Sequence, residues 1–402
     1  MESYAADALF LPAKKLSAFA KQQPTPFYLY DETGIRQTAA ALHGAFGAFA
    51  GFRQYFPIAM NPHPALLRLL HEAGYGVLCE NEAQLRLAAS CGFTGEEILF
   101  TPMAMLPPAE ALARELDCTF VLDGPHALPR RAPRRALLSL RPAQKLRLDD
   151  GSTVSFENLK TGMPEDALLH LAERLVRGGS ESVGLILHAC RNDLREGYYP
   201  AVAQALFTCA VHLKEQTGLT PDCCNLSDGL GVAYHRSDRE PSLAAVTERI
   251  AALRDDILLP AGLAGLRLET ALGRYALAKH AIFVARVAAV KPMKNTLLLV
   301  DAAQQQFPDA GSLATYHHVS ICGKDELRGR ILCDVAGCQM DLRSLFAARR
   351  PRPPAEPGDL VVFHDAGAAG HALSVPGTGF APCPEFLLTV NGDIVPLEHG
   401  EE

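Results

Sequence analysis

Several side chains that could do chemistry stand at or near the ends of short apolar runs. His188 closes one run, Glu269 lies in another, and the segment Ser-Asp-Gly-Leu-Gly at 227–231 ends a third. An imidazole can hold a ligand or move a proton near neutral pH. A carboxylate is costly to bury unpaired, so Glu269 either faces a polar pocket or is paired, with Arg274 as the nearest candidate. The structural alternative for His188 is a buried, hydrogen-bonded imidazole.

Other reactive side chains lie late in the chain. Cys338 could act as a nucleophile, but no activating histidine is assignable from the sequence, which favours a packed thiol. His364, Asp365 and His371 are residue types that bind metals. Their spacing matches no compact metal motif, so we expect no metal site.

Eight short apolar or β-branched runs alternate with helical patterns between residues 52 and 274. Such alternation predicts parallel strands joined by crossover helices, which eight repeats would close into a (β/α)8 barrel. Chemistry in such barrels collects at the carboxyl ends of the strands. The expected strands are 52–59, 74–80, 96–102, 118–124, 136–142, 182–189, 222–231 and 265–274.

Two segments between these runs carry clear local signals. Asn61 and Pro62 open an amphipathic pattern that Gly74 ends, which predicts a helix with a leucine stripe facing the core. In contrast, the segment 124–135 holds three prolines, so its crossover helix should be short or broken. After residue 275 strands follow one another without long helices, which predicts an antiparallel β domain.

The composition of the 402 residues is that of a packed globular protein, with 48% hydrophobic and 21% charged residues. A formal net charge of −7 opposes binding to nucleic acid. No export signal and no apolar run long enough for a membrane span is visible, so no membrane partner is expected. Eleven cysteines without a CxxC pair favour reduced thiols and a cytoplasmic location.

A set of motifs runs in order along nearly the whole chain: TPFYLYD, NPHPALLRLL, ENEAQLRLA, KTGMPEDAL, SDGLG, GCQMD and the pair GDLVVF and DAGAAG. These motifs resemble those of the fold-type III pyridoxal-phosphate decarboxylases, which include the diaminopimelate and ornithine decarboxylases. The resemblance implies an alanine-racemase-like barrel over 26–274 and a β sandwich or barrel domain made of 1–25 and 275–402. It also implies a head-to-tail homodimer with sites shared between subunits.

The resemblance fails at the residue on which the family chemistry depends. The family holds its cofactor on a lysine at the end of the first barrel strand, in a motif like YAVKANP. Here the matching stretch reads FPIAMNP, and Ala59 stands in the lysine position. A methyl group has no nitrogen with which to form an imine.

The matching phosphate cradle is altered as well. The family's Gly-Gly-Gly turn becomes Ser227-Asp228-Gly229, and an inward Asp228 would repel a phosphate by ~4 kcal/mol at ~4 Å and an effective dielectric of 20, about a thousandfold in affinity. Asp228 could instead turn outward and cap the next segment. The family's Gly-Ala-Tyr ends here in Ala369, which has no hydroxyl. The positions that the resemblance assigns to this degenerate cofactor site are Ala59, Asp228, Gly229, Gly231, Gly273, Arg274 and Ala369.

Other family positions persist. By resemblance, His188 matches the histidine that stacks on the cofactor ring and Glu269 the acid that pairs with the pyridine nitrogen. Cys338 and Asp341 match the pair that reaches into the neighbouring subunit's site, although they are three residues apart rather than four. A catalytic version of this chain would use these four residues.

Three interpretations follow. In the first, which we favour, the protein lacks Schiff-base chemistry and any cofactor, and binds or acts on an amino-acid-like small molecule at the barrel mouth, with a remaining lyase activity in the catalytic case. Pyridoxal phosphate would be a cofactor only if the site were less degenerate than its sequence indicates. In the second, the chain is a catalytically dead subunit in a heterodimer with an active paralogue. In the third, it is an active decarboxylase whose lysine was replaced by design, which leaves Asp228 and Ala369 unexplained.

Overall fold

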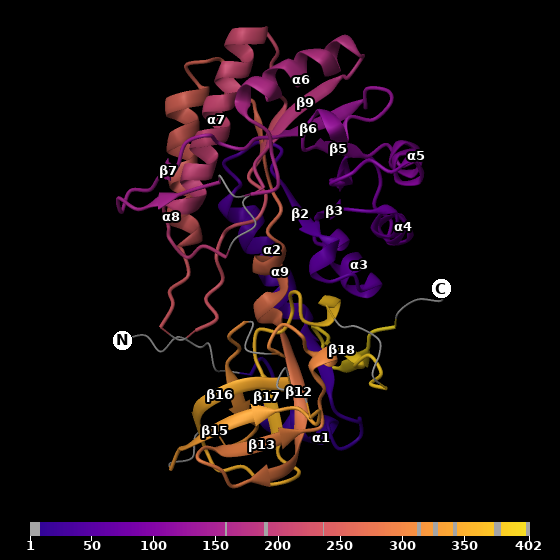
Figure 1. The fold of residues 1–402 in the computed structure, drawn as a ribbon, viewed down its shortest axis with the longest axis vertical. Helices are drawn as coiled ribbons and strands as arrows, with labels where there is room; N and C mark the ends of the chain where they lie inside the picture. Colours follow the sequence, from indigo (N-terminus) through magenta and orange to yellow (C-terminus); the bar gives the residue numbers. More distant parts are fainter. Residues whose placement is uncertain are drawn as a thin grey trace. The chain divides into compact units, whose positions relative to one another are not determined.

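The computed structural model describes residues 9–398 except 157–158, 189–191, 236, 312–314, 325–328, 341–343 and 374–378. The chain divides into two compact units (Figure 1). One, here called the barrel unit, comprises Arg36–Val232 and Glu240–Tyr275. The other, the sheet unit, comprises Met1–Ile35, Ala233–Arg239 and Ala276–Glu402.

Eight parallel strands close the barrel, one from each expected run, so the predicted fold class is confirmed. The strands are shorter than the runs because the last residues of most runs turn over the carboxyl end, here called the barrel mouth. In chain order they are β2 (Arg53–Pro57), β3 (Gly76–Cys79), β4 (Ile98–Phe100), β5 (Thr119–Leu122), β6 (Arg135–Ser139), β9 (Ser182–Ile186), β10 (Cys223–Asn225) and β11 (Arg267–Thr270).

Helices connect these strands as the periodicity predicts. Helix α3 begins at Pro64, where the His63 ring caps it by accepting a hydrogen bond from the Ala65 amide at 3.2 Å. After β5 only a single 3-10 turn, Pro125–Ala127, replaces a helix, as the three prolines predicted. The helices before, between and after these strands are α2 (Glu32–Ala45), α3 (Pro64–Glu72), α4 (Glu82–Ser90), α5 (Pro107–Glu115), α6 (Glu165–Arg177), α7 (Tyr198–Thr217), α8 (Leu243–Leu253) and α9 (Gly273–Leu277).

Side chains fill the barrel interior, which is therefore a core rather than a pore. One buried residue from each strand or its end joins a single cluster: Tyr55, Leu78, Leu99, Val121, Leu137, Ile186, Cys223 and Ala271. At the amino ends of the strands, Arg53 and Arg267 lie 3.5 Å and 3.4 Å from Glu96. Charge at this end is satisfied within the protein and belongs to stability rather than to chemistry.

The sheet unit holds a nine-stranded sheet of mixed direction. Most neighbouring pairs are antiparallel as expected, but β1 pairs with β18 and β13 with β15 in parallel. Its strands are β1 (Phe27–Asp31), β12 (Ala281–Lys291), β13 (Thr296–Val300), β14 (Val319–Ile321), β15 (Ile331–Ala336), β16 (Leu345–Arg352), β17 (Leu360–Phe363), β18 (Glu385–Leu388) and β19 (Ile394–Pro396).

Strand β1 corrects the predicted division of the chain. The sequence assigned residues from 26 onward to the barrel, yet β1 lies between β12 and β18 in the sheet and carries no barrel pairing. Helix α1 (Ala13–Phe19) packs on the same sheet, where Phe19 meets the rings of Phe27 and Phe386 edge-on. The observed division therefore falls after Ile35.

No helix among the described residues combines the length and the apolar character needed to cross a membrane.

Candidate functional site

Ala59 lies at the barrel mouth in a 3-10 turn, Ile58–Met60, that follows β2 directly. The turn packs tightly against the start of α9. A Cβ on Gly273 would lie 2.8 Å from both Pro57 Cδ and Met60 Cγ, so only glycine fits there without a shift. Gly273, predicted as a cofactor residue, thus has a packing role that fixes the position of Ala59.

Asp228 lies in the sharp turn after β10, where Ser227 has a φ of 55° and Gly229 a φ of 132°. Its half-buried carboxylate accepts a hydrogen bond from the Gly229 amide. Burial raises the pKa of Asp228 to about 6, although that bond and the charge of Arg274 both act to lower it. The turn therefore contains its own acidic group, which already uses one backbone donor.

The rest of the turn is covered by the segment after β9. The Asn192 amide accepts from the Val232 amide at 2.7 Å and donates to the Val232 carbonyl at 2.8 Å. A Cβ on Gly231 would collide with the carbonyl oxygen of Asp193. Gly231 is thus required by close packing of two backbone segments.

His188 is buried at the end of β9 and its Nδ1 lies 3.3 Å from Ser227 Oγ. Burial lowers the pKa of His188 to about 4, and the negative charge of Asp123 opposes this only in part. The ring is therefore neutral at pH 7. A neutral imidazole can accept a proton or donate a single N–H bond, but it supplies no positive charge.

Two residues around the contact of His188 with Ser227 were missed by sequence reasoning. Asp123, which follows β5, accepts a hydrogen bond from the Gly162 amide. Tyr199 donates to the Ser227 carbonyl at 2.9 Å and so supports the turn. Asp123 directly follows a barrel strand, which is the signal that could have found it.

Glu269 is buried inside the barrel, in register with Asn225 of the neighbouring strand. Its carboxylate accepts from Asn225 Nδ2 at 3.2 Å, and Arg267 lies 3.9 Å away. Burial raises the pKa of Glu269, while Arg267, Asn225 and Arg53 act in the opposite direction. The sequence suggested a pairing of Glu269 with Arg274. The structure instead pairs Glu269 with Arg267 of the same strand and Asn225 of the neighbouring strand.

Cys338 and Ala369 lie in the sheet unit. Cys338 is exposed rather than packed; its thiol donates to the Ala302 carbonyl at 3.4 Å, and partial desolvation raises its pKa, which disfavours the reactive thiolate. Ala369 has a φ of 62°. Asp341 falls outside the described residues.

The histidines around residue 365 serve structural contacts. His364 Nε2 lies 2.8 Å from Ser320 Oγ, and His371 Nδ1 lies 3.3 Å from Glu385 Oε2. Within the described part of the chain no three His, Cys, Asp or Glu side chains are grouped to hold a metal ion.

Comparison with known proteins places these features in a family. Residues 27–367 match the family described as pyridoxal-dependent decarboxylase, C-terminal sheet domain. The chain belongs to this family. Among the pyridoxal-dependent decarboxylases and their relatives, protein TabA of Pseudomonas amygdali pv. tabaci is 27% identical over 388 residues, with 96% of this chain and 91% of TabA covered.

Two further relatives are diaminopimelate decarboxylases. The protein from Methanothermobacter thermautotrophicus is 24% identical over 361 residues, covering 88% of this chain and 84% of its own. A crystal structure of the enzyme from M. jannaschii in co-complex with L-lysine matches with a TM-score of 0.86 at 17% identity, over 96% of this chain and 92% of that one. At that identity the likeness confirms the fold alone.

Proposed function

We propose that this chain is a divergent pyridoxal-dependent decarboxylase family member that has no Schiff-base chemistry and that binds or acts on an amino-acid-like small molecule at the barrel mouth. The observation that carries the proposal is Ala59, which stands in the turn after β2 where the family resemblance requires an amine. The residues at this turn do not fit a covalently held aldehyde.

No other lysine of the barrel unit takes over this position. Lys145 lies between β6 and β7, where it lines a cavity beside α7. Lys160 is exposed, and Lys214 donates to the Ala261 carbonyl at 2.7 Å near the end of α7. The barrel unit contains no further lysine in its sequence, so it offers no substitute amine at the turn.

The turn after β10 does not fit the phosphate of the cofactor either. The Asp228 carboxylate occupies the Gly229 amide, and it lies close enough to Arg274 for that charge to lower its pKa. An amide and an arginine are the partners that a bound phosphate would need. An entering phosphate would compete for both and meet a like charge.

What remains suits an amino acid rather than an anionic aldehyde. Asp123 and Asp228 are carboxylates near the ends of β5 and β10, and they can attract an ammonium group. Neutral His188, aligned by Ser227, can accept a hydrogen bond from such an ammonium group or donate one to a carboxylate. The M. jannaschii relative was crystallised with L-lysine, a molecule of this class.

In the catalytic form of this proposal His188 and Glu269 act on the ligand, with Cys338 or Asp341 supplied by a second copy of the chain. The burial of Glu269 beside Arg267 and the hydrogen-bonded Cys338 thiol leave His188 as the residue best prepared for that role. Replacement of His188 by Gln should weaken L-lysine binding, whereas replacement of the exposed His170 on α6 should not.

The experiment that tests the proposal uses pyridoxal phosphate itself. We expect the purified protein to show no new visible absorbance with this compound and no covalent adduct after borohydride reduction. A yellow protein that carries an adduct on a lysine would contradict the proposal.

Two measurements test the alternatives, the variant Ala59→Lys for an engineered loss of lysine and co-purification for a heterodimer. An engineered loss of lysine predicts that Ala59→Lys restores decarboxylation fully, whereas our proposal predicts little recovery while Asp228 and Ala369 remain. A co-purifying decarboxylase chain would favour the heterodimer instead.

A further inference from the structure

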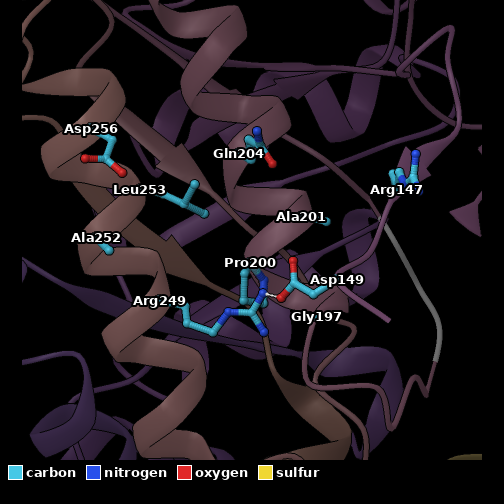
Figure 2. A pocket seen from close by; sticks show the side chains of 10 residues that line it. All are labelled: Arg147, Asp149, Gly197, Pro200, Ala201, Gln204, Arg249, Ala252, Leu253 and Asp256. Atoms are coloured by element: carbon cyan, nitrogen blue, oxygen red, sulfur yellow. Dashed lines mark ion pairs between the residues drawn. The ribbon is translucent and has the colours of Figure 1, made fainter. Parts of the chain in front are cut away.

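A cavity lies between α7 and the segment that follows β6. Its volume is about 550 Å³, within the range of small-molecule sites. A smaller cavity of about 210 Å³ adjoins it and shares Arg147, Ala201 and Gln204 (Figure 2). All lining residues belong to the barrel unit. The larger cavity is lined from three places: the segment Leu140–Arg147, the first residue of α6, and one face of α7.

The charges of the larger cavity are strongly unequal. Arg141, Lys145 and Arg147 line it, and none of them has a carboxylate partner among the described residues. The one carboxylate in its lining, Glu165, contacts a histidine: its Oε1 lies 2.6 Å from His212 Nδ1. Three cations therefore face this space against a single carboxylate, Glu165, which is itself held by His212.

The adjoining cavity adds little negative charge. Figure 2 shows Asp149 turned toward Arg249 of α8, with which it forms an ion pair, while Gln204 lies on α7 and Arg147 on the neighbouring hairpin. Asp256 is the remaining carboxylate there, and it follows Ala252 and Leu253 along the same helical run. It lines only the smaller cavity.

The segment that carries the three cations is fixed at both ends. At its start, the Arg141 amide donates to the Met163 carbonyl at 2.8 Å. At its end, β7 (Leu146–Arg147) pairs with β8 (Thr153–Val154), and the hairpin turn is held by the ion pair of Asp149 with Arg249. A preformed site loses less conformational entropy when a ligand binds.

The walls between the cations are apolar. Leu140 and Ala201 are buried, and Ala205 and Pro142 complete the surface. Thr208 and Gln204 of α7 are exposed and offer a hydroxyl and an amide opposite the cations. Charge at one side and an apolar wall at the other match an organic anion, not a bare inorganic ion.

We propose that this cavity is a binding site for a small organic anion that carries at least two negative charges, as phosphate or as carboxylate groups. Arg141 and Arg147 hold the charged groups through forked N–H donors, and Lys145 adds a third charge. Ala59, His188 and Asp228 do not line this cavity, so the proposal stands whether or not the function proposed for the barrel mouth is correct.

Isothermal titration calorimetry of the full-length protein tests the site, with adenosine 5′-monophosphate, citrate and pyrophosphate as probes. Adenosine monophosphate is expected to bind if the natural groups are phosphates, and citrate if they are carboxylates. Pyrophosphate, which lacks an apolar body, should bind more weakly than the better of the two. Affinity should fall as salt is raised.

The paired replacement Arg141→Ala with Arg147→Ala should weaken binding of that probe by at least about tenfold. The matched control is Arg174→Ala with Arg177→Ala on exposed positions of α6, which changes the net charge equally but lies outside the cavity. Thr208→Trp, at an exposed position of α7, should also abolish binding by filling the space.

Three results would overturn the proposal. One is the absence of binding heat with all three probes at millimolar concentration. Another is unchanged affinity in Thr208→Trp, which does not touch the charged segment and so serves if the arginine pair fails to fold. The third is an equal loss in the α6 control, which would reduce the effect to general electrostatics.

Discussion

At the scale of single residues, two changes at the barrel mouth support each other. By the family resemblance, Ala59 stands where an amine would hold the cofactor's aldehyde, and Asp228 stands where its phosphate would bind. Under the function that we propose, the first change removes the covalent link and the second disfavours the phosphate. Both are expected if the natural ligand of the mouth carries no phosphate.

The effect of the Asp228 charge on anion binding can be tested with sulfate, an anion that does not titrate in this pH range. Sulfate should bind Asp228→Asn at least about tenfold more tightly than wild type at pH 7.5, because the like charge is gone. In wild type its affinity should rise as pH falls through about 6, the pKa of Asp228, and in Asp228→Asn it should stay flat. Calorimetry at pH 5 and 7.5 measures both, with exposed Asp222→Asn as the control.

The same replacement should change stability with a definite sign. The folded-state pKa of Asp228 is raised from 3.8 to about 6, so its neutral form favours folding below pH 4, and this contribution is lost as pH rises to 6. The advantage of Asp228→Asn over wild type in urea unfolding should therefore grow across that window, up to about 3 kcal/mol, and then stay constant. An advantage that shrinks with rising pH would show that the carboxylate is not held in a burying environment.

The sequence proposes which residues form the candidate site, and the structure tests only the contacts of their side chains, which could not be predicted in every case. Glu269 pairs with Arg267 rather than Arg274 because residues two apart on a strand face the same side. That alternation was available from the sequence. The contact between His188 and Ser227 could not be predicted from the sequence. It depends on the positive φ of Ser227, which a serine does not indicate by its residue type.

At the scale of elements, the order of barrel strands followed from the alternation of apolar runs and helical patterns. The proline-rich segment 124–135 lost its helix for the reason foreseen. Strand β1 was assigned wrongly because its apolar pattern is the same in either sheet, and only the long-range pairing with β12 and β18 decides. The parallel pairs of the second sheet are hidden for the same reason.

Gly273 lies where the start of α9 packs against the turn after β2, so its replacement should disturb that contact. In Gly273→Ala the new Cβ would press on Pro57 and Met60, which should cost about 1 to 3 kcal/mol of unfolding free energy and shift the turn that carries Ala59. Gly265→Ala is the matched control, since nothing lies within 4 Å of its added Cβ. Equal stability of the two variants in urea would show that the turn is not fixed by this contact.

At the scale of the whole molecule, the two units have separate cores, and each can be tested for a role in assembly. The family resemblance implies a homodimer with shared sites, and the sheet unit offers a candidate contact beside Cys338. Met340 is 104% exposed, more than any other large apolar side chain described. An unbranched apolar side chain left fully in water near a position implied to reach a second subunit is what an open interface would present.

If Met340 contacts a second copy of this chain, light scattering should give a mass about twice that of the 43.3 kDa chain for wild type. Met340→Asp should shift the equilibrium toward monomer, because a carboxylate buried at an interface without a partner is costly. Met293, 59% exposed in the same unit, provides the control Met293→Asp, which should leave the dimer intact. A wild-type monomer that dimerises only when a decarboxylase relative is added would instead support the heterodimer. In that case the exposed methionine would contact a different chain rather than a second copy of this one.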